Sequence, residues 1–512
     1  MITKLPDEIL LEIFDFYRRS FKHQPDYERD WNNKNGWFKL AHVCHNWRCI
    51  VLASSSRLQL RLFFTDQTPT RAAVLTGLPP LPIVVDYLSV AWTFGRLGPE
   101  NRLISALRYP NRIYKIAMKI TLSNCNTITK VLDCAFPTLG TLELHNTSAP
   151  GFFFPPTFLM TSTKSLRRLK IPGAILTSLP PLLSATTALV DLTLAIDTIF
   201  SSPQGVSLPA LLQNLSRLRH LDVSVRSFHG PHTHAISPVK TNDAVSLAEL
   251  THFRFKGRTN HVEELVAGLA TPSLQKLYVA LYRGNSVVHI PHLSVIIRNM
   301  GMLFYAAQIK VSIGAYIISL LTHSHFIDDP PFNIFLHGPS AMAQVGSELY
   351  AMLTTVEDLF IAFCISPMYH GLPSVNIAPF RGLFEQLHNV KILRVQSGLE
   401  TKVADVLREH NGQPTKNHLP PVPDGANLDA TISSDIPTNP SRFNVGIFPS
   451  LEEIEIHPNS PGTQTPESER ASALEAFEEL VTARQQAGRP VRVYWNTDQV
   501  LPPSFYDMSG WR

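Results

Sequence analysis

The chain has 512 residues, of which 44% are hydrophobic and 17% charged, and a formal net charge of +4. This composition is typical of a folded globular protein and excludes a disordered one. The charge is too small to indicate nucleic acid as a partner, so none is expected.

The five cysteines are few, odd in number and scattered along the sequence. Such a pattern favours a reducing compartment. Asp7, Glu8 and Glu12 interrupt the first apolar stretch, which is therefore not read as a signal peptide. The longest uncharged apolar run, 311–321, falls short of the roughly 20 residues that cross a bilayer. We therefore expect a cytoplasmic or nuclear protein without membrane contact.

Residues 1–60 are predicted to be a separate unit of short helices. Pro6 and the acidic residues after it suit the first turn of a helix. Helical spacing predicts one apolar face made of Ile9, Leu10, Ile13, Phe14 and Tyr17. After a polar stretch at 22–34, a second helix continues to about residue 53. Its apolar face is made of Trp37, Leu40, Val43, Cys44 and Trp47. So small a core leaves apolar surface to spare, which indicates a partner.

Two stretches of this unit carry a family resemblance. Residues 5–14 read L-P-D-E-I-L-L-E-I-F, and residues 43–48 read V-C-H-N-W-R. Together they resemble the F-box, the short helical module that docks on the Skp-type adaptor of cullin-based ubiquitin ligases. The family usually joins these helices by a more compact segment than residues 21–36 of this chain. The resemblance implies that the adaptor is contacted by Leu5, Pro6, Ile9, Leu10, Ile13, Phe14, Val43, Cys44 and Trp47.

The next segment extends the resemblance. Residues 54–62, 68–71 and 81–85 are similar to the F-box-like proteins expanded in mushroom-forming fungi, which carry divergent leucine-rich C-terminal regions. The alternative interpretation is that residues 1–60 are only a helical cap at the end of a repeat array. A first strand is predicted at 83–88, a return helix at 99–107 and the next strand at 113–122.

From residue 139 the sequence repeats the pattern L-x-x-L-x-L. Clean copies begin at Leu139, Leu166, Leu189, Leu218, Leu250, Leu274 and Leu451, and weaker copies centre on Lys310, Phe335, Phe360 and Arg394. Strand geometry would turn both apolar residues of each L-x-L inward and the middle residue outward. Up to residue 394 the middle residues recur roughly every 23 to 34 residues, near the leucine-rich-repeat period of about 20–29, but without its regular asparagine.

We therefore predict an α/β protein, in which an N-terminal helical F-box precedes an irregular leucine-rich-repeat solenoid with a curved parallel sheet. A chance scatter of leucine in ordinary α/β structure is the alternative. Residues 411–447 are rich in proline, asparagine and aspartate and predict a loop or disordered insertion. A helix over 466–486 and a strand over 491–495 follow. The predicted parts are thus 1–60, 61–410, 411–447 and 448–512.

The outward residues of the strands indicate where a target would bind. A basic patch with a neighbouring aromatic residue is expected on the concave face, which suits an acidic or phosphorylated segment. Its members are Arg168, Lys170, Arg254, Lys256, Lys276, Tyr278 and Lys310. An ordinary solvated face is the alternative interpretation.

No catalytic motif stands out in the sequence. His229, His232 and His234 cluster in a Gly-Pro stretch that reads as a loop, so no metal site and no cofactor are expected. We therefore expect a non-enzymatic substrate receptor, which joins an adaptor, and through it a cullin, to a target protein. The alternative is a leucine-rich-repeat interaction scaffold with a degenerate F-box and no ligase role.

Overall fold

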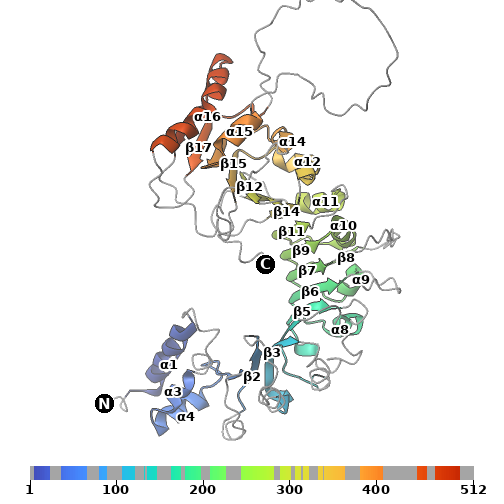
Figure 1. The fold of residues 1–512 in the computed structure, drawn as a ribbon. Coiled ribbons are helices and arrows are strands. Elements are labelled where there is room, and N and C mark those ends of the chain that lie inside the picture. Colours follow the sequence, from blue (N-terminus) through green and yellow to red (C-terminus); the bar gives the residue numbers. More distant parts are fainter. Residues whose placement is uncertain are drawn as a thin grey trace, which may run out of the picture. The chain divides into compact units, whose positions relative to one another are not determined.

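A computed structural model describes residues 5–22, 36–65, 80–88, 107–120, 132, 135–146, 163–174, 179–197, 208–226, 244–281, 289–300, 306–312, 315–321, 332–337, 339–363, 381–407, 447–457 and 467–495 (Figure 1). The contacts divide the chain into unit 1 (Met1–Gln275) and unit 2 (Lys276–Arg512). Three predicted features lie wholly or almost wholly outside the described residues: the return helix at 99–107, the histidine cluster at 229–234 and the insertion at 411–447.

Among the described residues, unit 1 begins with the helices α1 (Asp7–Lys22), α3 (Trp37–Ala41) and α4 (His45–Ala53). Helix α4 packs against both α1 and α3. The sequence predicted one continuous second helix. The structure divides it into α3 and α4, because the chain leaves the helical conformation between Ala41 and His45. Cys44 is extended there, and its Sγ accepts the backbone N–H of Trp47 at 3.4 Å. A cysteine thus takes the capping position at which a side chain satisfies a free helix N–H.

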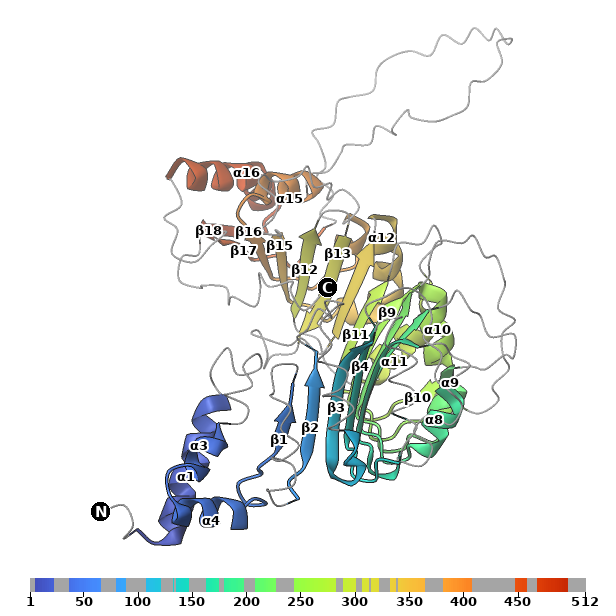
Figure 2. The ribbon, with the colours of Figure 1, turned by 60° about the horizontal axis from the view of Figure 1, so that its bottom comes forward.

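The described part of unit 1 continues with eight parallel strands, in the order β1-β2-β3-β4-β5-β6-β7-β9. Figure 2 shows β1, β2, β3 and β4 side by side. Their bounds are β1 (Leu62–Phe64), β2 (Ile83–Tyr87), β3 (Ile113–Ile120), β4 (Thr141–Asn146), β5 (Arg168–Ala174), β6 (Asp191–Asp197), β7 (His220–Arg226) and β9 (His252–Gly257). The sequence predicted the first strand at 83–88. That strand is β2, and the short strand β1, which was not predicted, precedes it. Strands β8 (Val245–Ser246) and β10 (Leu269–Ala270) pair in a separate small sheet.

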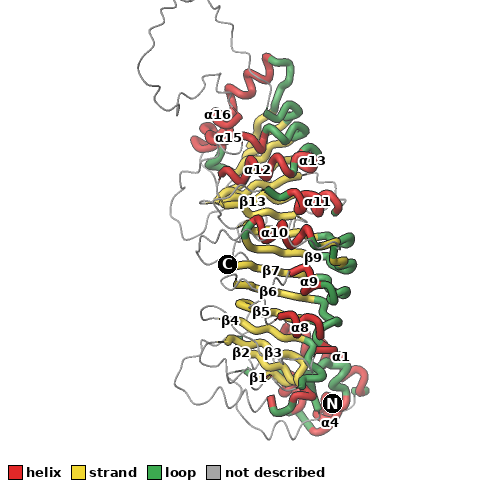
Figure 3. Tube along the Cα trace, turned by 90° about the vertical axis from the view of Figure 1, so that its right-hand side faces the viewer, coloured by secondary structure: helices red, strands yellow, loops and turns green. Residues whose placement is uncertain are grey.

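Helices and short turns return the chain between the strands of unit 1. Helices α8 (Leu179–Ala185), α9 (Leu208–Leu212) and α10 (Thr259–Ala267) lie over one face of the sheet (Figure 3). The apolar residues of the repeat fill the interior as predicted, and the L-x-L leucines of β6, Leu192 and Leu194, are at most 1% exposed. Burial of a leucine side chain contributes about 1.5–3 kcal/mol, so the repeated pattern supplies a continuous core. The repeat array is therefore confirmed in unit 1.

A backbone ladder joins successive repeats at the start of their strands. The residue after the first leucine of each copy donates its N–H to the carbonyl of the equivalent residue one repeat earlier. The bonds run from Arg167 to Gly140 at 2.9 Å, Val190 to Arg167 at 2.8 Å, Arg219 to Val190 at 2.8 Å and Thr251 to Arg219 at 3.0 Å. These bonds pair backbone groups of neighbouring repeats whatever side chain stands at that position.

Unit 2 departs from simple repetition. Its strands are β11 (Lys276–Leu281), β12 (Ala306–Ser312), β13 (Ala315–Leu321), β14 (Phe332–His337), β15 (Asp358–Phe363), β16 (Ile392–Gln396), β17 (Glu453–His457) and β18 (Arg492–Trp495). Their order is β11-β14-β13-β12-β15-β16-β17-β18, and β13 is antiparallel to both of its neighbours. The sequence prediction placed no strand at 315–321 and treated 309–311 and 334–336 as neighbouring repeats, which was wrong.

The helices of unit 2 are α11 (Pro291–Asn299), α12 (Pro339–Glu348), α13 (Tyr350–Leu353), α14 (Arg381–Phe384), α15 (Glu400–Leu407) and α16 (Glu467–Gln486). Helix α16 packs against α15 and buries Phe477, Ala473 and Ala476, whereas Leu474 is 38% exposed. The helix ends at Gln486, two residues before Gly488, whose positive φ of 73° favours glycine.

Buried Arg484 of α16 holds the backbone of the described segment that begins at Ile447. Its guanidinium donates to the backbone carbonyls of Ile447, Phe448 and Leu451. Phe448 is fully buried against the ring of Phe384, with ring centroids 5.1 Å apart. The buried Phe448 ring and Arg484 together fix the start of the segment that leads into β17.

Candidate functional site

The N-terminal helices present an apolar stripe to solvent. Leu5, Ile9, Ile13 and Phe16 recur at spacings of four, four and three, which places them along one side of α1 and its N-terminal extension. They are 39%, 48%, 45% and 76% exposed, and Val43, between α3 and α4, is 59% exposed. Exposed apolar side chains that cluster in this way mark an interaction surface. These five residues are called the apolar stripe below.

The nine residues that the F-box resemblance implied separate into two groups. Leu5, Pro6, Ile9, Ile13 and Val43 are exposed, whereas Leu10 and Phe14 are 1% and 0% exposed. The sequence placed all these α1 residues on one face, but the helix uses two adjacent faces. Leu10 and Phe14 are therefore core residues and are not available to a partner in this conformation.

The two remaining residues of that set, Cys44 and Trp47, support the helices from within. Cys44 caps α4, and the Trp47 ring meets the ring of Phe14 edge-on, with centroids 4.8 Å apart. Phe16, the most exposed large apolar residue of the stripe, was missed. Its spacing from Ile9 and Ile13 was the signal that could have revealed it.

The second candidate surface lies on unit 1, on the face of the sheet opposite α8, α9 and α10. We call it the open face. Its residues alternate with the buried leucines and occupy matching positions on neighbouring strands. One row across the strands β5, β6, β7 and β9 holds Arg168, Asp191, His220 and His252, and the next holds Lys170, Thr193, Asp222 and Arg254.

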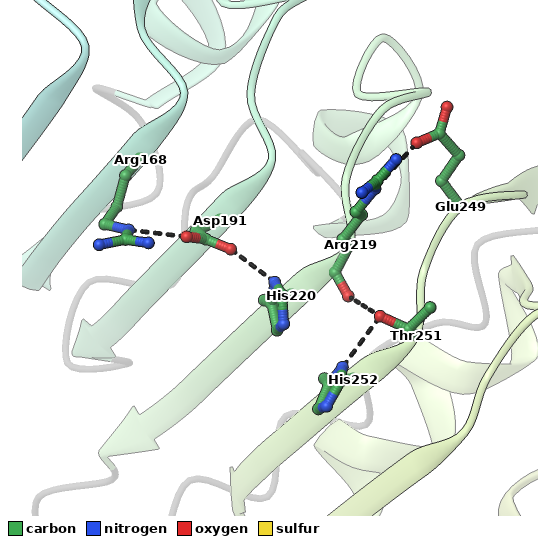
Figure 4. A network of polar contacts seen from close by, with 7 residues as sticks. All are labelled: Arg168, Asp191, Arg219, His220, Glu249, Thr251 and His252. Carbon is green, nitrogen blue, oxygen red and sulfur yellow. Dashed lines mark hydrogen bonds and ion pairs between the residues drawn. The ribbon is translucent and has the colours of Figure 1, made fainter. Parts of the chain in front are cut away.

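The open face carries both signs of charge, because acidic residues stand between the cations that the sequence assigned to a basic patch. Arg168 forms an ion pair with Asp191 at 2.7 Å, and Asp191 also contacts Nδ1 of His220 at 2.6 Å (Figure 4). The His220 and His252 rings stand 4.5 Å apart. Arg168 is therefore paired with a carboxylate of the neighbouring strand and is only partly available to a target.

The next row has an acidic residue at its centre. Asp222 lies on β7, between β5, which carries Lys170, and β9, which carries Arg254. Lys256 follows two residues after Arg254 on the same face of β9. Burial raises the pKa of Asp222, although these three cations act in the opposite direction. The structure thus brings Lys170, Arg254 and Lys256 around one carboxyl group, and all three side chains remain partly exposed.

The predicted target residues of unit 2 do not form one group. Lys276 and Tyr278 share one face of β11, but Lys310 belongs to β12, and both β14 and β13 lie between these strands. The Cα partners of Lys310 are Ile317 and Ala362. The error arose because the antiparallel strand β13 was not recognised within the apolar run at 311–321.

Unit 2 instead contains a buried polar cluster that the sequence did not reveal. Asp358 of β15, Arg394 of β16 and the β17 residues Glu455 and His457 lie on adjacent strands. Arg394 contacts Asp358 at 3.0 Å and Glu455 at 3.4 Å, and Nε2 of His457 lies 3.1 Å from Glu455. Tyr494 of β18 donates its hydroxyl to Glu455 at 2.7 Å. Burial raises the pKa of Tyr494, and the carboxylates of Glu455 and Glu453 raise it further. The cluster joins four strands through charge-assisted hydrogen bonds.

The cluster predicts a pH dependence for unit 2. Burial raises the pKa of Asp358 to about 6; Arg394 opposes this shift and Glu455 adds to it. The folded state then binds the proton more tightly than the unfolded state, so Asp358 contributes stability that is lost as pH rises through 6. We expect wild-type unit 2 to gain about 1 kcal/mol between pH 7 and pH 5 relative to Asp358→Asn. Hydrogen exchange of the β15–β17 amides at both pH values measures the difference, and equal pH profiles for the two proteins would contradict it.

Within the described residues, no group of three His, Cys, Asp or Glu side chains has an arrangement that could hold a metal ion. No helix in the described part of the chain is long and apolar enough to cross a membrane.

Comparisons with known proteins add little to this geometry. No protein-family model matches the sequence, and no curated protein matches it. Among solved structures, one similar chain is the leucine-rich-repeat-containing protein LegL7 from Legionella pneumophila, at 10% identity. The match covers 82% of this chain and 97% of that chain with a TM-score of 0.24. At that TM-score the likeness carries no argument, and the assignment of the repeat fold rests on the strand register and the buried leucines of this chain.

Proposed function

We propose that this protein is a non-enzymatic target-recognition subunit of a cullin-based ubiquitin ligase. The apolar stripe of the N-terminal helices would bind a Skp-type adaptor, and the repeat sheet would bind the target protein. Its contribution to ubiquitin transfer would be proximity between the target and the bound ligase. Neither nucleic acid nor a membrane is part of this proposal.

The observation that carries the proposal is the division of α1 into two apolar faces. Leu10 and Phe14 are buried, and Phe14 meets the Trp47 ring, whereas Ile9, Ile13 and Phe16 remain 48%, 45% and 76% exposed. A helix that keeps a second apolar line exposed suits helix-in-groove recognition, in which residues three and four apart anchor the contact. This placement agrees with the F-box resemblance of the same residues.

The adaptor contact predicts a clear effect of two substitutions. Each buried apolar side chain at such a contact is worth roughly 1.5–3 kcal/mol, so Ile9→Asp with Ile13→Asp should weaken adaptor binding by at least 100-fold. Co-purification of the full-length chain with a purified Skp-type adaptor measures the loss. Since both side chains are almost half exposed, the helices should remain folded.

A matched control separates this contact from a general loss of exposed apolar surface. Val295 and Tyr350 of unit 2 are 46% and 45% exposed, close to the values for Ile9 and Ile13. Val295→Asp with Tyr350→Asp should leave adaptor capture unchanged. Wild-type adaptor binding by the Ile9 and Ile13 double variant would place the contact elsewhere. Failure of the wild-type chain to bind any Skp-type adaptor would favour the second function, an interaction scaffold with a degenerate F-box.

A further inference from the structure

The open face of unit 1 contains an imidazole nitrogen whose position calls for an explanation. His145 lies on β4 and is half-buried. Its Nε2 has almost no solvent-accessible surface and no hydrogen-bond partner among the described residues. Buried polar nitrogens are nearly always bonded to protein, water or an ion, and an orphan such as this one indicates a missing partner.

Lysines surround this imidazole on the two neighbouring strands. Lys119 of β3 is the Cα partner of His145, and Lys170 of β5 is the Cα partner of Glu143, two residues earlier on the same face of β4. Lys115 is already paired with Glu143 through a 2.9 Å contact. Neither Lys119 nor Lys170 forms an ion pair within the described part of the chain. Lys170 also acts on the more distant Asp222 carboxyl group, so the positive charge beside the orphan nitrogen is only partly compensated.

The charge around His145 is positive on balance. Burial lowers the pKa of His145, and Lys170, Lys119 and Lys115 lower it further, while Glu143 acts in the opposite direction. Three cations thus outweigh one carboxylate around a group that could itself donate a hydrogen bond. An anion placed between the two lysines would relieve this excess of positive charge and give Nε2 an acceptor.

We propose that His145, Lys119 and Lys170 form a binding site for a phosphoryl group carried on a segment of the target protein. This inference rests on the proposed target-binding role of the sheet and specifies the chemistry that one part of the sheet recognises. A phosphate dianion offers three strong acceptor oxygens and close to two negative charges, which match one imidazole N–H and two ammonium groups.

Two other anionic partners fit this part of the face less well. A single carboxylate would neutralise only one of the two lysines. A polyanion such as RNA would run along the same face into Asp191 and Asp222, whose negative charges would oppose it. An isolated phosphoryl group avoids both problems, because it is compact and contacts only β3, β4 and β5.

Inorganic phosphate provides the first test on the full-length protein. The imidazole signal of His145 is followed by NMR in protein labelled with ¹³C-histidine, and His145→Gln identifies that signal. At constant ionic strength, replacing chloride by phosphate should move the signal saturably and raise the pKa of His145. Lys119→Gln and Lys170→Gln should each weaken the apparent affinity at least fivefold. The control Lys164→Gln removes the same charge from an exposed turn before β5 and should change the affinity less than twofold.

N-acetyl-phosphoserine amide provides the second test, because it carries the phosphoryl group as a protein segment would. Binding at least as tight as that of inorganic phosphate, with the same loss in Lys119→Gln and Lys170→Gln, would support the proposal. Binding of inorganic phosphate alone would overturn it in favour of a free-phosphate site. A phosphate response that is absent, or equal in all three lysine variants, would overturn it altogether. Adaptor capture by Lys119→Gln stays at the wild-type level in every case, so failure of this site is distinguishable from failure of the ligase role.

Discussion

Leu10→Asp is expected to unfold the N-terminal helices, whereas Ile13→Asp, three residues later, leaves them intact. Leu10 is 1% exposed, so the substitution loses roughly 1.5–3 kcal/mol of apolar burial and adds the cost of an unpaired buried carboxylate. A helical module of this size has only a few kcal/mol of stability to lose. Hydrogen exchange of the α1 amides should therefore reach the unprotected rate in Leu10→Asp.

The comparison with Ile13→Asp separates folding from binding. Ile13 is 45% exposed, and its substitution should cost less than about 0.5 kcal/mol of stability while it removes adaptor binding. Both variants lose the adaptor, but only Leu10→Asp loses protection in α1. Full protection of α1 in Leu10→Asp would show that the two apolar faces of the helix have been assigned the wrong way round.

The second large effect is expected from Arg484→Met in α16. The methionine can fill the apolar part of the site but cannot donate to the carbonyls of Ile447, Phe448 and Leu451. The two shorter bonds, to Ile447 and Phe448, are each worth about 1.5–3 kcal/mol because the donor is charged, so we expect a loss of about 3–5 kcal/mol in the free energy of local opening. The opening should involve residues 447–457 and α16 together, and hydrogen exchange of these amides measures it.

Arg489→Met is the matched control for this prediction. Arg489 also donates to a carbonyl of the same segment, that of Pro449, but its side chain is exposed and the contact is long, at 3.4 Å. Its loss should change stability by no more than about 0.5 kcal/mol. Equal effects of the two arginine substitutions would mean that burial of Arg484 does not fix this segment.

Periodicity predicted the elements that repeat. Apolar residues such as Leu192 and Leu221 recur with the alternation of a half-buried strand, and the structure buries them at the expected places. The pattern could not reveal β13, because 315–321 reverses direction within an apolar run whose residues fit either a parallel or an antiparallel strand. Strand order depends on which turn the chain makes, and residue spacing alone does not determine it.

The candidate surfaces were less predictable than the fold. Helical spacing identified Ile9 and Ile13 together with Leu10 and Phe14, but only packing decides which line of α1 faces the core. On the open face, the prediction selected cations such as Arg168 and passed over acidic residues at equivalent positions. The pairing of Arg168 with Asp191 depends on strands that are neighbours in space. The sequence did not single out His145, because the burial of its Nε2 and the lysines near it depend on neighbouring strands.

The central claim is that the apolar stripe is a docking site for a Skp-type adaptor. The most direct measurement is hydrogen exchange of the full-length chain with and without the purified adaptor. The account predicts new protection in peptides that cover residues 5–17 and 43–47, with unchanged exchange in the strands of both units. Adaptor binding without added protection at residues 5–17, or no adaptor binding at all, would contradict it.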